Sequence, residues 1–288
     1  MRDRVIVGVV AAVSLGHAVG SATGVTAAGA PGYGAALEAA DAWVRGDVRA
    51  LVHLALDRTV PGALAVWSGL WLAALGTSTT VAVASLLPFH ELAADGLWRG
   101  GKAVGGTSGA AWALLGGLGA AGVLAAGADT RAAFPLFACV AYAVGAGIER
   151  RWARAAGGAV AAVVFGAGEV TVRASLLDVV GPALGIGAVA ALLLRGNAVT
   201  LGLVAASAVV TIAAHFLDVD AAVAVPFLAL AGAAAAATPW AAAGLGALAL
   251  AQIVGFHTDR AAWPGRPAAL RGVVADTAAL DPVLDWLA

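Results

Sequence analysis

The chain has 288 residues, of which 61% are hydrophobic and 11% are charged, and its formal net charge at pH 7 is -1. Water-soluble domains carry about 25% charged residues, so this composition, with a mean hydropathy of +0.93, indicates an integral membrane protein. The scattered basic residues exclude the electrostatic footprint of a nucleic-acid-binding protein. The single cysteine, Cys139, excludes an internal disulfide and a cysteine-based metal site.

Apolar segments of helix length follow one another along the chain and predict about eight to ten membrane spans, because a span needs roughly 20 mainly apolar residues. They occur at about residues 5–25, 59–76, 78–90, 104–127, 132–148, 155–168, 176–194, 198–215, 220–237 and 239–256. The predicted fold is therefore all-α, a polytopic integral membrane helical bundle.

Two further segments and the N-terminal arginines complete this organisation. Residues 28–58 alternate charges and tryptophan with alanine, which is typical of an amphipathic segment at a membrane interface. Residues 257–288 contain prolines and charges and are expected to form a tail outside the membrane. Arg2 and Arg4 place the N-terminus in the cytoplasm. We therefore expect a multi-pass protein of the plasma membrane.

One short motif carries candidate chemistry. The stretch "GGTSGAAWALLGG", residues 105–117, places Ser108 between glycines at the start of an apolar segment. A serine in that position is commonly a helix N-cap or a residue that lets two helices pack closely. The other interpretation is a nucleophile, which requires an adjacent base to take the proton of the hydroxyl.

This motif resembles the segment that opens the serine-bearing helix of the rhomboid intramembrane proteases. Residues 50–76, "ALVHLALDRTVPGALAVWSGLWLAALG", look like the second helix of that family, and residues 176–196, "LLDVVGPALGIGAVAALLLRG", look like its sixth. The resemblance implies a rhomboid-like six-helix membrane domain over residues 1–196. Additional transmembrane helices would follow at 197–256, and then the tail at 257–288.

The resemblance also implies roles for individual residues. Ser108 matches the family's nucleophile, but Pro182 occupies the position of its base histidine, and proline has no proton to exchange. Arg58 and Gly62 occupy the positions of the histidine and asparagine that help to bind the oxyanion. Among the histidines of this chain, His215 is the least implausible displaced base. The remaining histidines are His17, His53, His90 and His257.

Three functions follow as hypotheses. The leading one is a rhomboid-like protein with an incomplete protease dyad, which binds transmembrane segments or other membrane partners. The first alternative is an active intramembrane serine protease with Ser108 as nucleophile and His215 as base. The second is a small-molecule transporter, because glycine-rich broken helices are common in transporters. Membrane lipids are expected partners, nucleic acid is not, and no cofactor or metal is expected.

Overall fold

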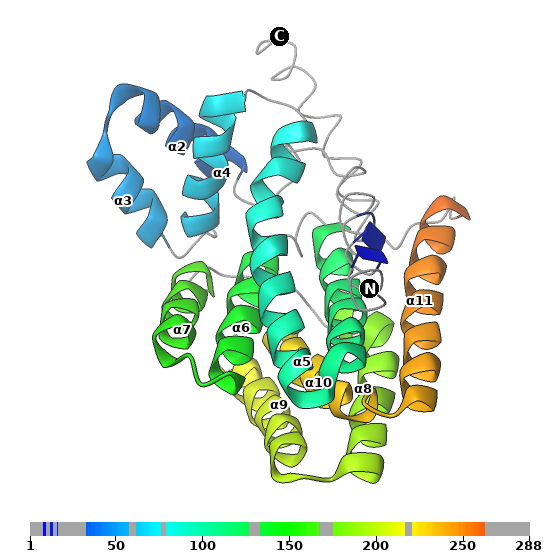
Figure 1. The fold of residues 1–288 in the computed structure, drawn as a ribbon. Coiled ribbons are helices and arrows are strands. Elements are labelled where there is room, and N and C mark those ends of the chain that lie inside the picture. The colour runs from blue at the N-terminus through cyan, green and yellow to red at the C-terminus, as the bar shows by residue number, and fades with distance from the viewer. Residues whose placement is uncertain are drawn as a thin grey trace.

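The computed structural model describes residues 33–57, 62–75, 79–126, 133–166, 175–216 and 221–262, with isolated residues 8, 9, 12, 13 and 16. Within these ranges every regular element is a helix (Figure 1), which confirms the all-α prediction. The elements are α2 (Tyr33–Arg45), α3 (Val48–Leu56), α4 (Gly62–Leu75), α5 (Thr79–Ala126), α6 (Ala133–Ile148), α7 (Trp152–Gly166), α8 (Ser175–Arg195), α9 (Ala198–Phe216), the 3-10 turn η3 (Ala221–Ala224), α10 (Val225–Ala235) and α11 (Pro239–Ala262). Most of the predicted first span at 5–25, and the predicted tail beyond residue 262, fall outside the described residues.

The prediction of membrane-spanning helices is wrong. Crossing a bilayer takes roughly 20 apolar residues in one helix, whereas α4, α6, α7 and α10 have only 14, 16, 15 and 11 residues. Across the described part of the chain, no helix has both the length and the apolar composition that a crossing requires. This finding overturns the predicted polytopic membrane bundle, its additional transmembrane helices and the multi-pass plasma-membrane localisation.

Helix α5 is a hairpin rather than one straight rod. Its course is broken at Gly105 (φ -133°, ψ 17°) and Gly106 (φ 66°, ψ -158°). The two arms, residues 79–104 and 107–126, pack against each other beyond this turn. A Cβ atom added at Gly101 would lie 2.8 Å from both the Ala113 Cβ and the Gly109 carbonyl oxygen. The sequence predicted separate spans at 78–90 and 104–127, but the polar stretch between them is helical too.

Helix α10 forms the centre of the main bundle. It packs against α5, α6, α8 and α9 (Figure 1), and nine of its 11 residues are buried. The large buried side chains around it include Leu97, Phe134 and Phe137. A short helix that is apolar on all sides suits this central position, because protein surrounds most of it.

Trp112 is the largest side chain in this core, and glycines make room for its ring. It is 2% exposed, and its Nε1 donates a hydrogen bond to the Ala229 carbonyl oxygen at 3.1 Å. A Cβ added at Gly187 would lie 2.8 Å from the ring, and one added at Gly232 would overlap Nε1. The second arm of α5, α8 and α10 therefore meet around one indole.

Helices α2, α3 and α4 pack together beside the main bundle (Figure 1). Gly69 of α4 lies so close to α2 that a Cβ there would come within 2.6 Å of the Ala39 Cβ. Trp67 of α4 connects this unit to α5, because its Nε1 donates to the Ser85 carbonyl oxygen at 2.9 Å. Its ring also meets Phe89 edge-on, with ring centroids 5.6 Å apart.

Candidate functional site

Ser108 lies at the start of the second arm of α5, directly after the hairpin turn. Its side chain is exposed. The residue that packs closely here is the adjacent Gly109, where an added Cβ would lie 2.7 Å from the Gly101 carbonyl oxygen and 2.8 Å from the Ala233 carbonyl oxygen. The glycines of the motif thus make the turn and the close helix contact, and the serine faces outward.

The two histidines whose side chains the structure describes do not approach Ser108. His90 lies on the first arm of α5, 15 residues before Gly105, so the rise of an α-helix separates it from the turn by roughly 22 Å. His53 lies on α3, which packs against α2 and α4. His215 and His257 fall within α9 and α11, but their side chains, like the whole of His17, fall outside the described residues.

Of the other positions implied by the protease resemblance, the structure describes only Gly62 in full. Gly62 is buried at the start of α4, and a Cβ added there would overlap the Leu54 carbonyl oxygen. The backbone therefore leaves no space for a side chain at this position. Arg58 lies outside the described residues, and Pro182 falls within α8 with its side chain outside them.

His90 is 5% exposed, although the acidic Glu91 follows it directly in the sequence. The nearest atoms of this pair, His90 Nδ1 and Glu91 Oε1, are 4.0 Å apart, and Glu91 is largely exposed. The helical spacing contained a signal for burial. Leu86, Phe89, Ala93 and Leu97 are all buried on the same arm, and residue 90 lies on that face.

A group of ion pairs joins the first arm of α5 to the end of α6. Arg99 Nε is 2.6 Å from Asp95 Oδ1, one turn earlier on the same helix, and Arg99 Nη1 is 3.8 Å from Glu149 Oε2. Arg151 Nε lies 3.1 Å from the same Glu149 oxygen. The hydrogen bond to Asp95, with the charge of that carboxylate, raises the pKa of Arg99 above its ordinary value. Both carboxylates are thus engaged by arginines, which is an arrangement that fastens helices together.

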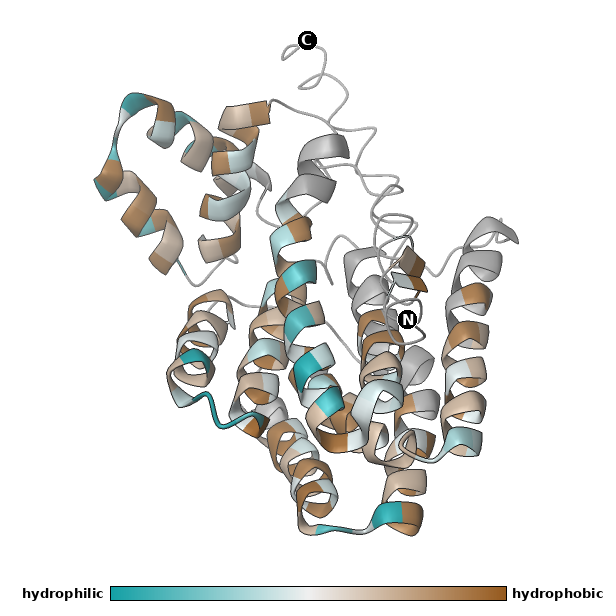
Figure 2. Cartoon of the chain, in the orientation of Figure 1, coloured by the Kyte–Doolittle hydropathy of each residue, from teal (hydrophilic) through white to brown (hydrophobic). Residues whose placement is uncertain are grey.

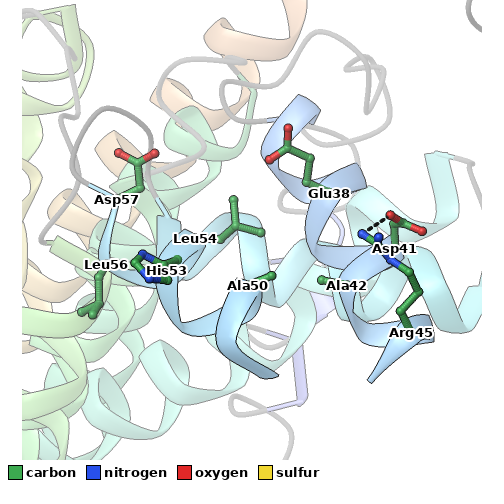
Figure 3. A pocket seen from close by; sticks show the side chains of 9 residues that line it. All are labelled: Glu38, Asp41, Ala42, Arg45, Ala50, His53, Leu54, Leu56 and Asp57. Atoms are coloured by element: carbon green, nitrogen blue, oxygen red, sulfur yellow. Dashed lines mark ion pairs between the residues drawn. The ribbon is translucent and has the colours of Figure 1, made fainter. Parts of the chain in front are cut away.

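A shallow hollow of about 700 Å³ lies between α2 and α3 (Figure 3). Its lining includes the carboxylates of Glu38, Asp41 and Asp57, the imidazole of His53 and the guanidinium of Arg45. Arg45 Nη2 pairs with Asp41 Oδ2 at 2.5 Å, one turn apart on α2. Within the described part of the chain, no three histidine, cysteine or acidic side chains are grouped as metal ligands would be. The hollow is therefore an acidic surface feature without a cluster of metal ligands among the described residues.

Cys139 is the other side chain with nucleophilic potential, and burial suppresses that potential. It is 1% exposed within α6. Desolvation raises the pKa of its thiol to about 11. Because the thiolate is the reactive form, the thiol stays protonated and inert at neutral pH and serves as a small apolar side chain of the core.

Comparisons with family models, curated proteins and solved structures find no match for this chain. An intramembrane protease of the rhomboid kind holds its site among membrane-spanning helices, and the described residues form none. The expectation of a multi-pass rhomboid-like protein, whether serine protease or pseudoprotease, is corrected for that reason. The similarity around Ser108 stays a prediction from a short motif.

Proposed function

We propose that the protein is a non-catalytic binding protein, and that its partner is an apolar helix of another protein that packs on the outer face of α9. The observation that carries this proposal is the set of large hydrophobic side chains exposed on that helix. Leu201, Val209 and Ile212 are 61%, 65% and 59% exposed. Their spacing places them within about 80° of one another around the helix axis, so they form one apolar face.

The neighbouring helices also expose apolar side chains. Figure 2 shows apolar residues along the outer helices of the bundle, and α8 exposes Ile186, Val189 and Leu193. Fully burying one side chain of this size contributes about 1.5–3 kcal/mol relative to leaving it in water. Exposed apolar surface on this scale is typical of a site that another molecule covers.

A helix suits the α9 face better than a flexible partner because small residues lie among the large ones. Gly202 and Ala205 are exposed on α9, and a Cβ added at Gly202 would meet nothing within 4 Å. Inside the bundle, the chain brings helices together by the same means. Gly96 of α5 and Gly145 of α6 are so close that a Cβ on either glycine would overlap the backbone of the other helix. The face on α9 offers an apolar helix the same close approach.

The proposal also includes that Ser108 takes no part in catalysis. A serine hydroxyl is a weak nucleophile until a base accepts its proton, and Ser108 is exposed, with the described imidazoles distant from the turn. We therefore expect that Ser108→Ala leaves partner binding unchanged.

Binding of a defined apolar peptide tests the proposal. The probe is a fluorescent helical peptide of leucine and alanine, about 20 residues long and ended by glutamines, kept in solution by a mild detergent. Fluorescence anisotropy measures its affinity for the full chain. We expect the double variant Val209→Gln and Ile212→Gln to bind the peptide at least ten-fold more weakly. This corresponds to a loss of about 1.4 kcal/mol or more in the free energy of binding.

Val48→Gln on α3 is the matched control, since Val48 is 66% exposed but lies on a different helix. It should bind the peptide as the wild type does. Equal affinities for the wild type, the control and the α9 double variant would overturn the proposal. Self-association of the chain through α9, detected as a dimer that the double variant dissolves, would replace the partner helix with a second copy.

A further inference from the structure

Apart from Glu91 on α5, the charged side chains that the structure describes lie in two parts of the molecule. The unit formed by α2 and α3 carries four carboxylates and two arginines. The other part, which we call the basic end, is the end of the bundle at which the α5 turn, the α6–α7 connection and the α8–α9 connection lie (lower end in Figure 1). Its basic side chains are Arg99, Lys102, Arg150, Arg151, Arg154 and Arg195.

The basic end keeps a positive excess after its ion pairs are counted. Asp95 and Glu149 are the carboxylates that the ion pairs place here, and they are engaged by Arg99 and Arg151. The remaining four basic residues, Lys102, Arg150, Arg154 and Arg195, are all exposed. Arginine predominates, and its planar guanidinium binds phosphate oxygens with two parallel hydrogen bonds.

An exposed tryptophan and an exposed leucine adjoin these charges. Trp152 stands between Arg151 and Arg154 and is 69% exposed, and Leu193, 80% exposed, lies two residues before Arg195. Figure 2 shows the hydrophilic connection between α6 and α7 directly against apolar helices. Tryptophan is enriched at the headgroup level of lipid layers, where one side of the ring is apolar and the other is wet.

We propose that the basic end binds the headgroups of anionic phospholipids, with the arginines on phosphate and Trp152 among the headgroups. A phospholipid joins a phosphate to apolar chains, and this matches a basic surface that borders directly on exposed apolar residues. A nucleic acid would satisfy the arginines but leave Trp152 and Leu193 in water. This contact lies at a lipid surface and requires no helix to cross it.

Vesicle flotation with the full chain tests the proposal. The probes are vesicles of phosphatidylcholine alone and vesicles that also contain phosphatidylglycerol. The wild type should float with the anionic vesicles and bind the neutral ones much more weakly, and added salt should weaken the binding. Removing one basic residue should reduce the affinity about five-fold, and the double variant Arg150→Gln and Arg154→Gln about 30-fold.

The matched control is the double variant Arg45→Gln and Arg49→Gln, which removes the same charge from the acidic α2–α3 unit. It should bind anionic vesicles at least as well as the wild type. Equal loss in both double variants, or equal binding of the wild type to neutral and anionic vesicles, would overturn the proposal. So would tighter binding to a single-stranded RNA oligonucleotide than to the anionic vesicles. The apolar-peptide test above uses an uncharged probe, so its outcome is independent of this one.

Discussion

Single residues show how little space separates the helices of this bundle. Gly232 of α10 faces the Trp112 ring, and a Cβ added there would overlap Nε1, which donates to the Ala229 carbonyl oxygen. The ring is buried and confined also by Gly187 of α8. Close-packed interiors of this kind resist even one extra methyl group.

We therefore expect Gly232→Ala to destabilise the protein by about 1–3 kcal/mol, because the indole must shift and its hydrogen bond must distort. Urea unfolding followed by circular dichroism measures the change in the free energy of unfolding. The control is Gly244→Ala on α11, where an added Cβ meets nothing within 4 Å. Alanine has the higher helix propensity, so the control should be neutral or gain up to about 1 kcal/mol. Equal effects of the two substitutions would contradict the packing described for Trp112.

The sequence located Ser108 and the glycines around it but not what each of them does. Glycine next to serine is compatible with close packing, a cap or a nucleophile, because the pattern does not say which residue faces a neighbour. The structure assigns the close approach to Gly105 and Gly109 and exposes Ser108. The helical spacing of its arm, rather than its acidic neighbour Glu91, determines the burial of His90.

At the scale of elements, the hairpin in α5 is the feature that the sequence predicted least well. The two apolar segments were expected as separate spans, whereas the polar residues between them continue the first arm down to Gly105. The reversal depends on Gly106. Its φ of 66° and ψ of -158° lie in a backbone region that residues with a Cβ atom almost never adopt.

Replacing Gly106 with alanine tests this turn. No atom lies within 4 Å of the added Cβ, so the whole cost is conformational, and we expect a loss of about 1–3 kcal/mol in the free energy of unfolding. Gly157→Ala on α7 also meets open space but lies in an ordinary helix, and it should not destabilise the protein. A Gly106→Ala variant as stable as the wild type would show that the chain does not turn here as described.

Most predicted helices were confirmed within a few residues at their ends, as for 198–215 against Ala198–Phe216 of α9. Periodicity and apolar runs locate such helices well because both depend on local sequence. The contacts around each helix, in contrast, are made by residues that lie far away in the sequence. The segment 220–237 was predicted as a span, but it forms η3 and the short α10, which neighbouring helices of the same chain bury.

At the scale of the whole molecule, the composition alone does not distinguish helices that span a membrane from helices that are buried in a protein core. The fold prediction was wrong for this reason. A helix that is apolar on all sides belongs either in lipid or in a protein core, and helix length decides between the two. Most of the 11 residues of α10 are buried by their own neighbours.

Ion pairs between elements likewise depend on residues that lie far apart in the sequence. Arg99 and Glu149 lie on different elements, far apart in sequence, and meet only when α5 packs against the end of α6.

The molecule as a whole thus combines a glycine-packed helical core, outer apolar faces and a basic end. The central proposal is that the protein acts by binding a partner through the outer face of α9, without chemistry at Ser108. Photocrosslinking tests this claim most directly. Benzoylphenylalanine is incorporated at position 209 in one variant and at position 108 in another, and each is irradiated with the apolar peptide. We predict a crosslinked product from position 209 and none from position 108. Crosslinking from position 108 alone would contradict the account.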